Sequence, residues 1–199
     1  MKKDNDIPSV RERAMDAAAT CFQSLGLGKT SMEAVAQQGG MSRATLYRHF
    51  SNRDELAIAV IEREALQVAT QVQQRIGTLQ TIEDYIVEGV VEACKDIAAS
   101  AILNSLLEAE SIGSSGQLLL MTNRLTNIGI DIVKPMIEPA QQAGIIRDDV
   151  SAEVIMDWIL RIVISLLTIP GKTTSTDDKK RALLKAMLLP ALLKQPIHS

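Results

Sequence analysis

The sequence predicts an all-α protein, with a small N-terminal three-helix domain at residues 1–52 and a larger helical domain at residues 53–199. Apolar residues recur at helical spacing along nearly the whole chain, and no run alternates with the two-residue period of a strand. Ser, Thr, Asp and Asn mark the expected helix starts, and Gly and Pro mark the stops. With 199 residues, the chain is long enough to bury a core of its own.

The expected helices follow in the order Ser9–Leu25, Ser31–Gln38, Ser42–Phe50, Arg53–Ile76, Ile82–Ser100, Ile102–Ser111, Gln117–Ala143, Ala152–Ile169 and Asp177–Leu193. The seventh contains Pro135 and Pro139, each of which removes a helical N–H and crowds the preceding turn. We therefore expect that helix to bend or break there. Pro190 is expected to act in the same way near the end of the last helix.

The stretch after the first helix, "GLGKT", ends as a phosphate-binding P-loop does. A P-loop needs a glycine five positions before the Gly-Lys-Thr, where this chain has Gln23, and it follows a buried strand. The residues before this stretch have helical spacing instead. We therefore expect a helix that stops at Gly26, with Gly26 and Gly28 in backbone conformations that favour glycine.

Two short helices joined by a glycine turn are expected next. Thr30 and Glu33 fit a capping box, in which the hydroxyl caps the helix and the carboxylate reaches back to the cap. Gly39 and Gly40 end this helix in a tight turn without side-chain cost. Ser42 is then expected to cap the second short helix.

The second short helix has one inward face, because Leu46 and Phe50 are four residues apart. This arrangement directs the remaining side chains to the flanks and the outside, namely Arg43, Thr45, Tyr47, Arg48 and His49. Two short helices with this spacing predict a helix-turn-helix, whose second helix is suited to the major groove of DNA.

The run "AVAQQGGMSRATLYRHFSNRDEL" resembles the core signature of TetR-type transcriptional regulators, and the resemblance covers the first sixty or so residues. The chain departs from that signature in four places. Gly39 stands where alanine is common, Met41 where valine is usual, Ala44 where glycine is frequent and Arg53 where lysine is usual. None removes an essential charge or packing group, but Ala44 adds a methyl group where the backbone approaches DNA.

The resemblance implies a set of DNA-contacting residues: Thr30, Ser42, Arg43, Ala44, Thr45, Tyr47, Arg48, His49 and Arg53. Thr30 and Ser42 would touch phosphates at helix N-termini, and Arg43 would grip a guanine with its fork. Thr45 would meet a thymine methyl group or a phosphate. The other side chains would hold phosphates along the groove edge.

Simpler roles remain open for three of these residues. Tyr47 could be part of the core, although Leu46 and Phe50 already define the inward face. Arg53 could be only a solvated charge beside its cap. His49 is a poor candidate for a metal ligand, because the chain has one other histidine, His198. No metal site, cofactor or catalytic residue is predicted.

Charge is unevenly distributed along the chain, whose net charge is −3. Up to Phe50 there are seven basic and five acidic residues, whereas the remainder has 14 basic and 19 acidic residues. A mildly basic N-terminal part permits local phosphate binding while the acidic remainder keeps the protein soluble. Cys21 and Cys94 show no pairing pattern, and the polar start is no secretory signal, so the expected location is the cytoplasm.

The larger domain is expected to bind a small molecule, because its helices are apolar on more than one face. The predicted pocket is aliphatic and would take an uncharged or amphipathic effector; its candidate residues are Ile86, Val90, Met121 and Trp158. Met121 and Trp158 could instead be plain core. A ligand-induced shift could travel along the Arg53–Ile76 helix to the DNA-binding helices.

The last two helices are also too apolar for one buried face each. By the resemblance, they would form a homodimer interface, which would place two recognition helices about one DNA turn apart. Ordinary core packing is the alternative. The most apolar run, Val154–Ile169, contains Asp157 and Arg161 and is too short to span a membrane.

The expected function is therefore a dimeric repressor that an effector releases from a palindromic operator. An all-α enzyme and a helical adaptor without DNA binding are the alternatives. Against an enzyme, the sequence has no metal-ligand spacing, no nucleophile paired with a histidine and no glycine-rich cofactor loop.

Overall fold

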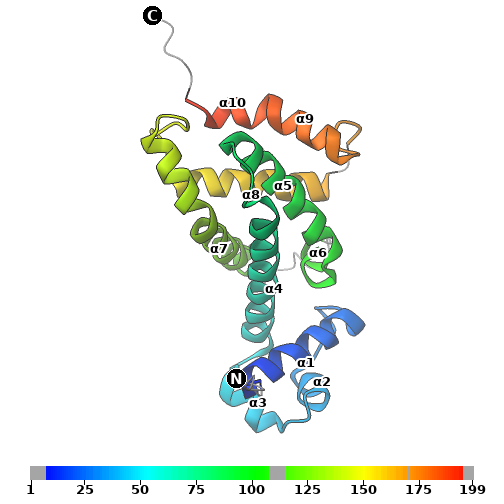
Figure 1. Ribbon diagram of the computed structural model, residues 1–199. Coiled ribbons are helices and arrows are strands. Elements are labelled where there is room, and N and C mark those ends of the chain that lie inside the picture. Colours follow the sequence, from blue (N-terminus) through cyan, green and yellow to red (C-terminus); the bar gives the residue numbers. More distant parts are fainter. Residues whose placement is uncertain (1–7, 108–114, 170, 195–199) are drawn as a thin grey trace, which may run out of the picture. The chain divides into compact units, whose positions relative to one another are not determined.

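The computed structural model describes residues 8–107, 115–169 and 171–194, with the backbone alone for residues 115–123. Its helices are α1 (Val10–Leu25), α2 (Met32–Gln38), α3 (Arg43–His49), α4 (Arg53–Ile76), α5 (Ile82–Ala99), α6 (Ala101–Leu107), α7 (Ser115–Gln142), α8 (Ala152–Thr168), α9 (Asp177–Met187) and α10 (Leu189–Leu192) (Figure 1). Within the described ranges these helices are joined by loops and one isolated bridge, Ile146 to Leu193. The predicted all-α fold is confirmed.

Most helix bounds agree with the prediction to within two residues, and the differences have local causes. α7 is not broken, because one helix runs through both Pro135 and Pro139. The last predicted helix is divided at Leu188 into α9 and α10, next to Pro190, which lies in the first turn of α10. The predicted end of the sixth helix, Ser111, lies outside the described residues.

The chain forms two compact units. Unit 1 comprises the described residues of Met1–Glu64 and Ala101–Gly113, and unit 2 those of Ala65–Ser100 and Ser114–Ser199. α4 is continuous and belongs to both. These units are defined by packing, whereas the predicted domains, 1–52 and 53–199, are defined by role. The two divisions therefore assign the first part of α4 and all of α6 differently.

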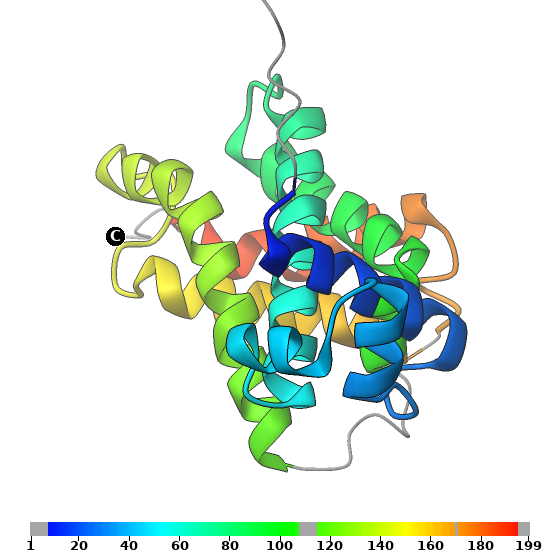
Figure 2. The same cartoon turned by 90° about the horizontal axis from the view of Figure 1, so that it is seen from below.

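Unit 1 is built around α1, which packs against α2, α3 and α6 (Figure 2 shows α1 in dark blue). A capping box fixes the start of α1, since Ser9 Oγ accepts from the N–H of Glu12 and Glu12 accepts from the N–H of Ser9. The buried face of α1 has helical spacing and consists of Ala14, Met15, Ala17, Ala18, Cys21 and Phe22. α1 ends at Gly26, whose φ of 83° favours glycine.

Unit 2 has a core of aliphatic side chains in which α5 packs against α8 and α9, and α7 against α8. The fully buried members of α5 are Ile86, Val87, Val90, Val91 and Cys94. Burial raises the pKa of the Cys94 thiol to about 11, so this cysteine is protonated at neutral pH. No described helix is both long enough and apolar enough to cross a membrane.

Candidate nucleic-acid interface

The turn between α2 and α3 is held by backbone hydrogen bonds and by close packing on α1. The N–H groups of Gly39, Gly40 and Met41 donate to the carbonyls of Val35, Gln37 and Ala36 at 2.9, 3.2 and 3.0 Å. Gly40 has φ of +59°, in the left-handed region, as the turn requires. A Cβ atom on Gly39 would lie 3.2 Å from the Cβ of Ala17 and 2.8 Å from the Met41 methyl group. Gly40 is therefore needed for its backbone conformation, and Gly39 because a side chain there would collide with its neighbours.

α3 begins at a side-chain cap, as predicted. Ser42 Oγ accepts a hydrogen bond of 3.0 Å from the N–H of Thr45, and the two hydroxyl groups lie 2.9 Å apart. Leu46 and Phe50 are completely buried, which confirms the predicted inward face. Arg11 of α1 places its guanidinium 4.9 Å from the centre of the Phe50 ring, which adds a cation–π contact between α1 and the end of α3.

Most of the other side chains of α3 and its cap are polar and exposed. The exposed residues are Ser42, Arg43, Ala44, Tyr47, Arg48 and His49, and Thr45 is half-buried. Tyr47 is 43% exposed, which rules out the alternative that it is a core residue. The structure thus brings together seven of the nine residues predicted to contact DNA, all of them within the cap and body of one short helix.

Arg43, the residue predicted to grip a base, has one charged neighbour on α2. Its Nη1 lies 3.9 Å from Glu33 Oε2, and both side chains are well exposed. An exposed pair at this distance contributes little to stability. Arg43 can therefore leave Glu33 at small cost.

The predicted capping role of Thr30 is wrong. Ser31, not Thr30, caps α2, because its Oγ accepts from the N–H of Ala34 at 3.2 Å. Thr30 is 2% exposed, and its hydroxyl donates to the carbonyl of Gly26 at 2.9 Å. With the hydroxyl buried in this bond, Thr30 stabilises the loop between α1 and α2 and offers no free hydroxyl to a phosphate.

Ser31 is the residue that the sequence reasoning missed. Thr30 and Ser31 are adjacent and both are good caps, so the sequence alone left an ambiguity of one residue. Ser31 is exposed at the start of α2, and so is Lys29 just before it.

Arg53 is half-buried rather than simply solvated. Its Nη1 donates to the carbonyl oxygen of Gly28 at 2.8 Å and lies 3.5 Å from that of Leu27. Gly28 does not have a positive φ, contrary to expectation, and its carbonyl is the acceptor that Arg53 uses. The guanidinium therefore links the start of α4 to the loop before α2.

The described residues that were predicted to line an effector pocket, Ile86, Val90 and Trp158, lie in different surroundings. Ile86 and Val90 belong to the closely packed core of unit 2. Trp158 is 51% exposed on α8, so it is neither a core residue nor a buried pocket wall. Met121 lies outside the residues whose side chains are described.

A metal centre has no support in the part of the chain that the structure describes, where no His, Cys, Asp and Glu side chains group together in a way that could hold an ion. His49, the only histidine in that part, is an exposed residue of α3. The exposed side chains of α3 offer hydrogen-bonding groups and positive charge, which suit phosphates and base edges.

Comparisons with known proteins agree with this geometry. Residues 14–60 match the family model described as bacterial regulatory proteins, tetR family. Over 157 residues, or 79% of each chain, the protein is 24% identical to the HTH-type transcriptional regulator UidR of Escherichia coli K12.

Solved structures share the fold. FadR from Bacillus subtilis in complex with stearoyl-CoA has a TM-score of 0.66 and 16% identity, over 87% of this chain and 97% of that chain. AibR in complex with isovaleryl coenzyme A and operator DNA has a TM-score of 0.56 and 19% identity, over 92% of this chain and 99% of that chain.

Proposed function

Because the chain belongs to the TetR family of bacterial transcriptional regulators, we propose that it is a dimeric repressor released from a palindromic operator by a small effector. A transcriptional regulator of this family is not an enzyme. The proposal concerns the finer properties, which are the DNA contacts, the dimer, the operator symmetry and the effector.

The observation that supports the DNA contacts best is the two-sided character of α3. Leu46 and Phe50 fix one side in the core, while Arg43, Tyr47, Arg48 and His49 are exposed on the other. In this proposal Arg43 enters the major groove and donates to guanine O6 and N7. Tyr47, Arg48 and His49 hold phosphates, and so do Ser42 and Thr45 at the start of the helix.

Thr30 and Arg53 change role relative to the sequence-based prediction. Ser31 and Lys29 replace Thr30 as the proposed phosphate contacts near α2, because they are exposed whereas Thr30 is buried. Arg53 donates one N–H to the Gly28 carbonyl oxygen, so a phosphate contact would use its remaining N–H groups. Ala44 is exposed and close to the proposed base contact, so its methyl group limits how near the backbone comes to DNA.

A second copy of the chain is the proposed partner of the exposed apolar side chains on α8 and α9. On α8 and its C-terminal cap these are Val154, Trp158, Ile164 and Ile169, and on α9 Met187. Exposed large apolar side chains on two consecutive helices are typical of interfaces. A two-fold dimer would also supply the second recognition helix that specific operator affinity requires.

The proposed effector is apolar or amphipathic. The interior of unit 2 consists mainly of Ile, Leu and Val side chains, with no aromatic ring among its fully buried residues in the described part of the chain. Such surroundings favour an aliphatic group over a planar cation. Two structural neighbours were solved with acyl-CoA esters, stearoyl-CoA in one case and isovaleryl-CoA in the other.

Selection from a library of random DNA duplexes tests the proposal. The purified protein should enrich a consensus with two-fold symmetry, and each bound duplex should retain two copies of the chain. Tyr47→Ala should bind the consensus weakly, whereas the control Lys172→Ala, an exposed lysine in unit 2, should bind it normally. Failure to enrich any sequence, or equal binding by wild type and Tyr47→Ala, would contradict the assignment.

A further inference from the structure

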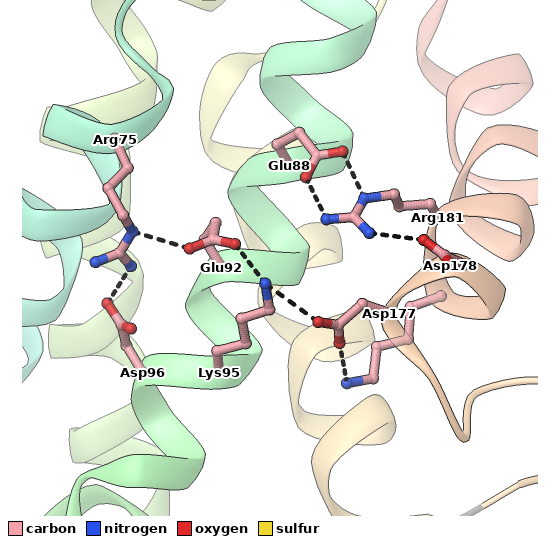
Figure 3. Close-up of polar contacts among 9 residues, drawn as sticks. Arg75, Glu88, Glu92, Lys95, Asp96, Asp177, Asp178 and Arg181 are labelled. Atoms are coloured by element: carbon pink, nitrogen blue, oxygen red, sulfur yellow. Dashed lines mark hydrogen bonds and ion pairs between the residues drawn. The ribbon is translucent and has the colours of Figure 1, made fainter.

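Four acidic residues form a stripe along α5. Asp84, Glu88, Glu92 and Asp96 follow each other at intervals of four, so they lie on one side of the helix. Like charges at this spacing repel each other and destabilise an isolated helix. The stripe is therefore expected to need cations from neighbouring elements, and Figure 3 shows how such cations surround three of its four members.

α9 supplies cations to the first half of the stripe. Arg181 makes a two-pronged contact with Glu88, at 2.8 and 2.9 Å, and Lys185 lies 3.6 Å from Asp84 (the Arg181 pair is drawn in Figure 3). Further along α5 the charges are exchanged, since the cation Lys95 is on α5 and lies 3.1 Å from the carboxylate of Asp177 on α9. These three pairs run in opposite order along the two helices. They therefore fix the antiparallel register of α5 and α9.

α4 supplies the cation for the second half. Arg75 Nε lies 2.8 Å from Glu92, and Arg75 Nη2 also pairs with Asp96. Glu92 is shared, because Lys95 Nζ lies 2.7 Å from it. The chain of contacts Arg75–Glu92–Lys95–Asp177 thus joins α4 to α9 through α5 (Figure 3). We call the pairs of Arg75, Glu88, Glu92, Lys95, Asp96, Asp177 and Arg181 the ion-pair array.

The array is better suited to positioning than to stability. Glu92 and Asp96 are only 19% exposed, whereas Arg75 and Lys95 are 42% exposed. Partly exposed single pairs contribute little to stability, because solvent screens them and ordering the side chains costs entropy. In the connected contacts Arg75–Glu92–Lys95–Asp177, however, each of the four side chains has two charged partners, which defines the relative positions of α4, α5 and α9.

The position of Arg75 gives this network a consequence for DNA binding. Arg75 is the penultimate residue of α4, and α4 is one helix from Arg53 onward, starting four residues after α3 ends at His49. The opposite end of the network, Asp177, is the first residue of α9, which bears part of the proposed dimer surface.

We propose that the ion-pair array positions α4 relative to α9, so that the two α3 helices of a dimer are held in a geometry that fits both halves of an operator. The inference rests on the proposed function, because it needs a dimer and a two-part site. Loss of the array would leave each DNA-binding surface intact but would make the second contact entropically more costly.

Arg75→Gln tests this inference in the full-length chain. The probes are a selected duplex with two half-sites and a duplex with one. Affinity for the two-half-site duplex should fall by roughly two- to thirty-fold, the range typical of coupling through packed elements. Affinity for the single half-site should not change, and light scattering should still give a dimer. Arg75→Lys, which keeps the charge, should restore much of the loss.

Lys134→Gln is the matched control, because Lys134 pairs with Glu138 and Glu153 at 3.5 and 3.8 Å in the same unit without involving α4. It should bind both duplexes as the wild type does. Equal losses on both duplexes in Arg75→Gln, unchanged binding to both, or a monomeric Arg75→Gln would overturn the inference.

Hydrogen exchange provides a measurement that does not depend on DNA. The amides of residues 65–76 in α4 should exchange faster in Arg75→Gln than in the wild type, because one anchor of the helix end is lost. Unchanged exchange would overturn the inference. If exchange is faster in Arg75→Gln but the wild-type protein selects no duplex, the inference about the array holds at the level of the helix and the proposed function is contradicted.

Discussion

The guanidinium of Arg53 donates a hydrogen bond of 2.8 Å to the carbonyl oxygen of Gly28, 25 residues earlier in the chain. This contact joins the first residue of α4 to the loop that precedes α2. The side chain therefore contributes to the local fold of the DNA-binding unit, whatever it does when DNA is present.

Replacing Arg53 by Met should lower the free energy of unfolding by roughly 1 kcal/mol, the usual contribution of one such hydrogen bond. Urea titration followed by circular dichroism measures this change. Arg53→Lys keeps the charge but lacks the planar fork, so it should recover only part of the loss. A stability equal to that of the wild type in Arg53→Met would show that the contact has no energetic role.

Ser31 and Thr30 should respond differently to loss of their hydroxyl groups. Ser31→Ala removes the α2 cap and should cost roughly 1 kcal/mol of stability, whereas Ser31→Gly should cost only a few tenths. Thr30→Val keeps the buried shape but removes the bond to Gly26, which should also cost roughly 1 kcal/mol. Denaturant unfolding of the three variants checks these values. A neutral Ser31→Ala with a costly Thr30→Val would instead favour Thr30 as the cap.

Trp158 should anchor the dimer. An exposed tryptophan in the middle of α8 is the kind of residue that dominates an interface, and a lysine in its place would put a charge there. Trp158→Lys should therefore be monomeric by light scattering at concentrations where the wild type is dimeric. Leu66→Lys replaces an equally exposed apolar residue on α4, 52% exposed, and should remain dimeric. If light scattering gave the same molar mass for Trp158→Lys and Leu66→Lys, the proposed interface would be contradicted.

Lys95 should make the stability of unit 2 sensitive to acid. A hydrogen bond from Lys95 is the main cause that lowers the pKa of both Glu92 and Asp177 from their ordinary values of 4.5 and 3.8. A lowered pKa in the folded state gives stability that is present above the ordinary value and is lost as the pH falls through the lowered value.

Lys95→Met should therefore be less stable than the wild type at pH 7, and the difference should shrink as the pH falls below about 4. Thermal unfolding across this pH range measures the difference. A gap between the two proteins that does not depend on pH would show that Lys95 acts through packing alone.

The helices and the inward face of α3 could be predicted from the sequence because they depend on local rules. Leu46 and Phe50 are four residues apart, and Ser42 is the single good cap before them. At α2 the same rules left two neighbouring candidates, Thr30 and Ser31, which are separated only by the structure, where Ser31 makes the capping bond and Thr30 is buried.

Long-range contacts were beyond these local rules. Arg53 bonds to Gly28 across 25 residues, and the acidic stripe of α5 finds its partners on α4 and α9. The spacing of the stripe was visible in the sequence, but its partners were not. The exposure of Trp158 was likewise unpredictable, because an apolar helix does not indicate which of its faces is covered by its own chain.

We propose that the outward face of α3 recognises DNA sequence through Arg43, and relative affinity on two duplexes tests this role most directly. The measurement compares wild type and Arg43→Ala, at one salt concentration, on a selected duplex and on an unrelated duplex of equal length. Arg43→Ala should bind the selected duplex more weakly by roughly 1 to 3 kcal/mol, or about five- to 150-fold, the range for one two-pronged base contact. It should bind the unrelated duplex almost as well as the wild type and keep the same circular dichroism spectrum. Equal losses on both duplexes, or no loss on either, would contradict the claim.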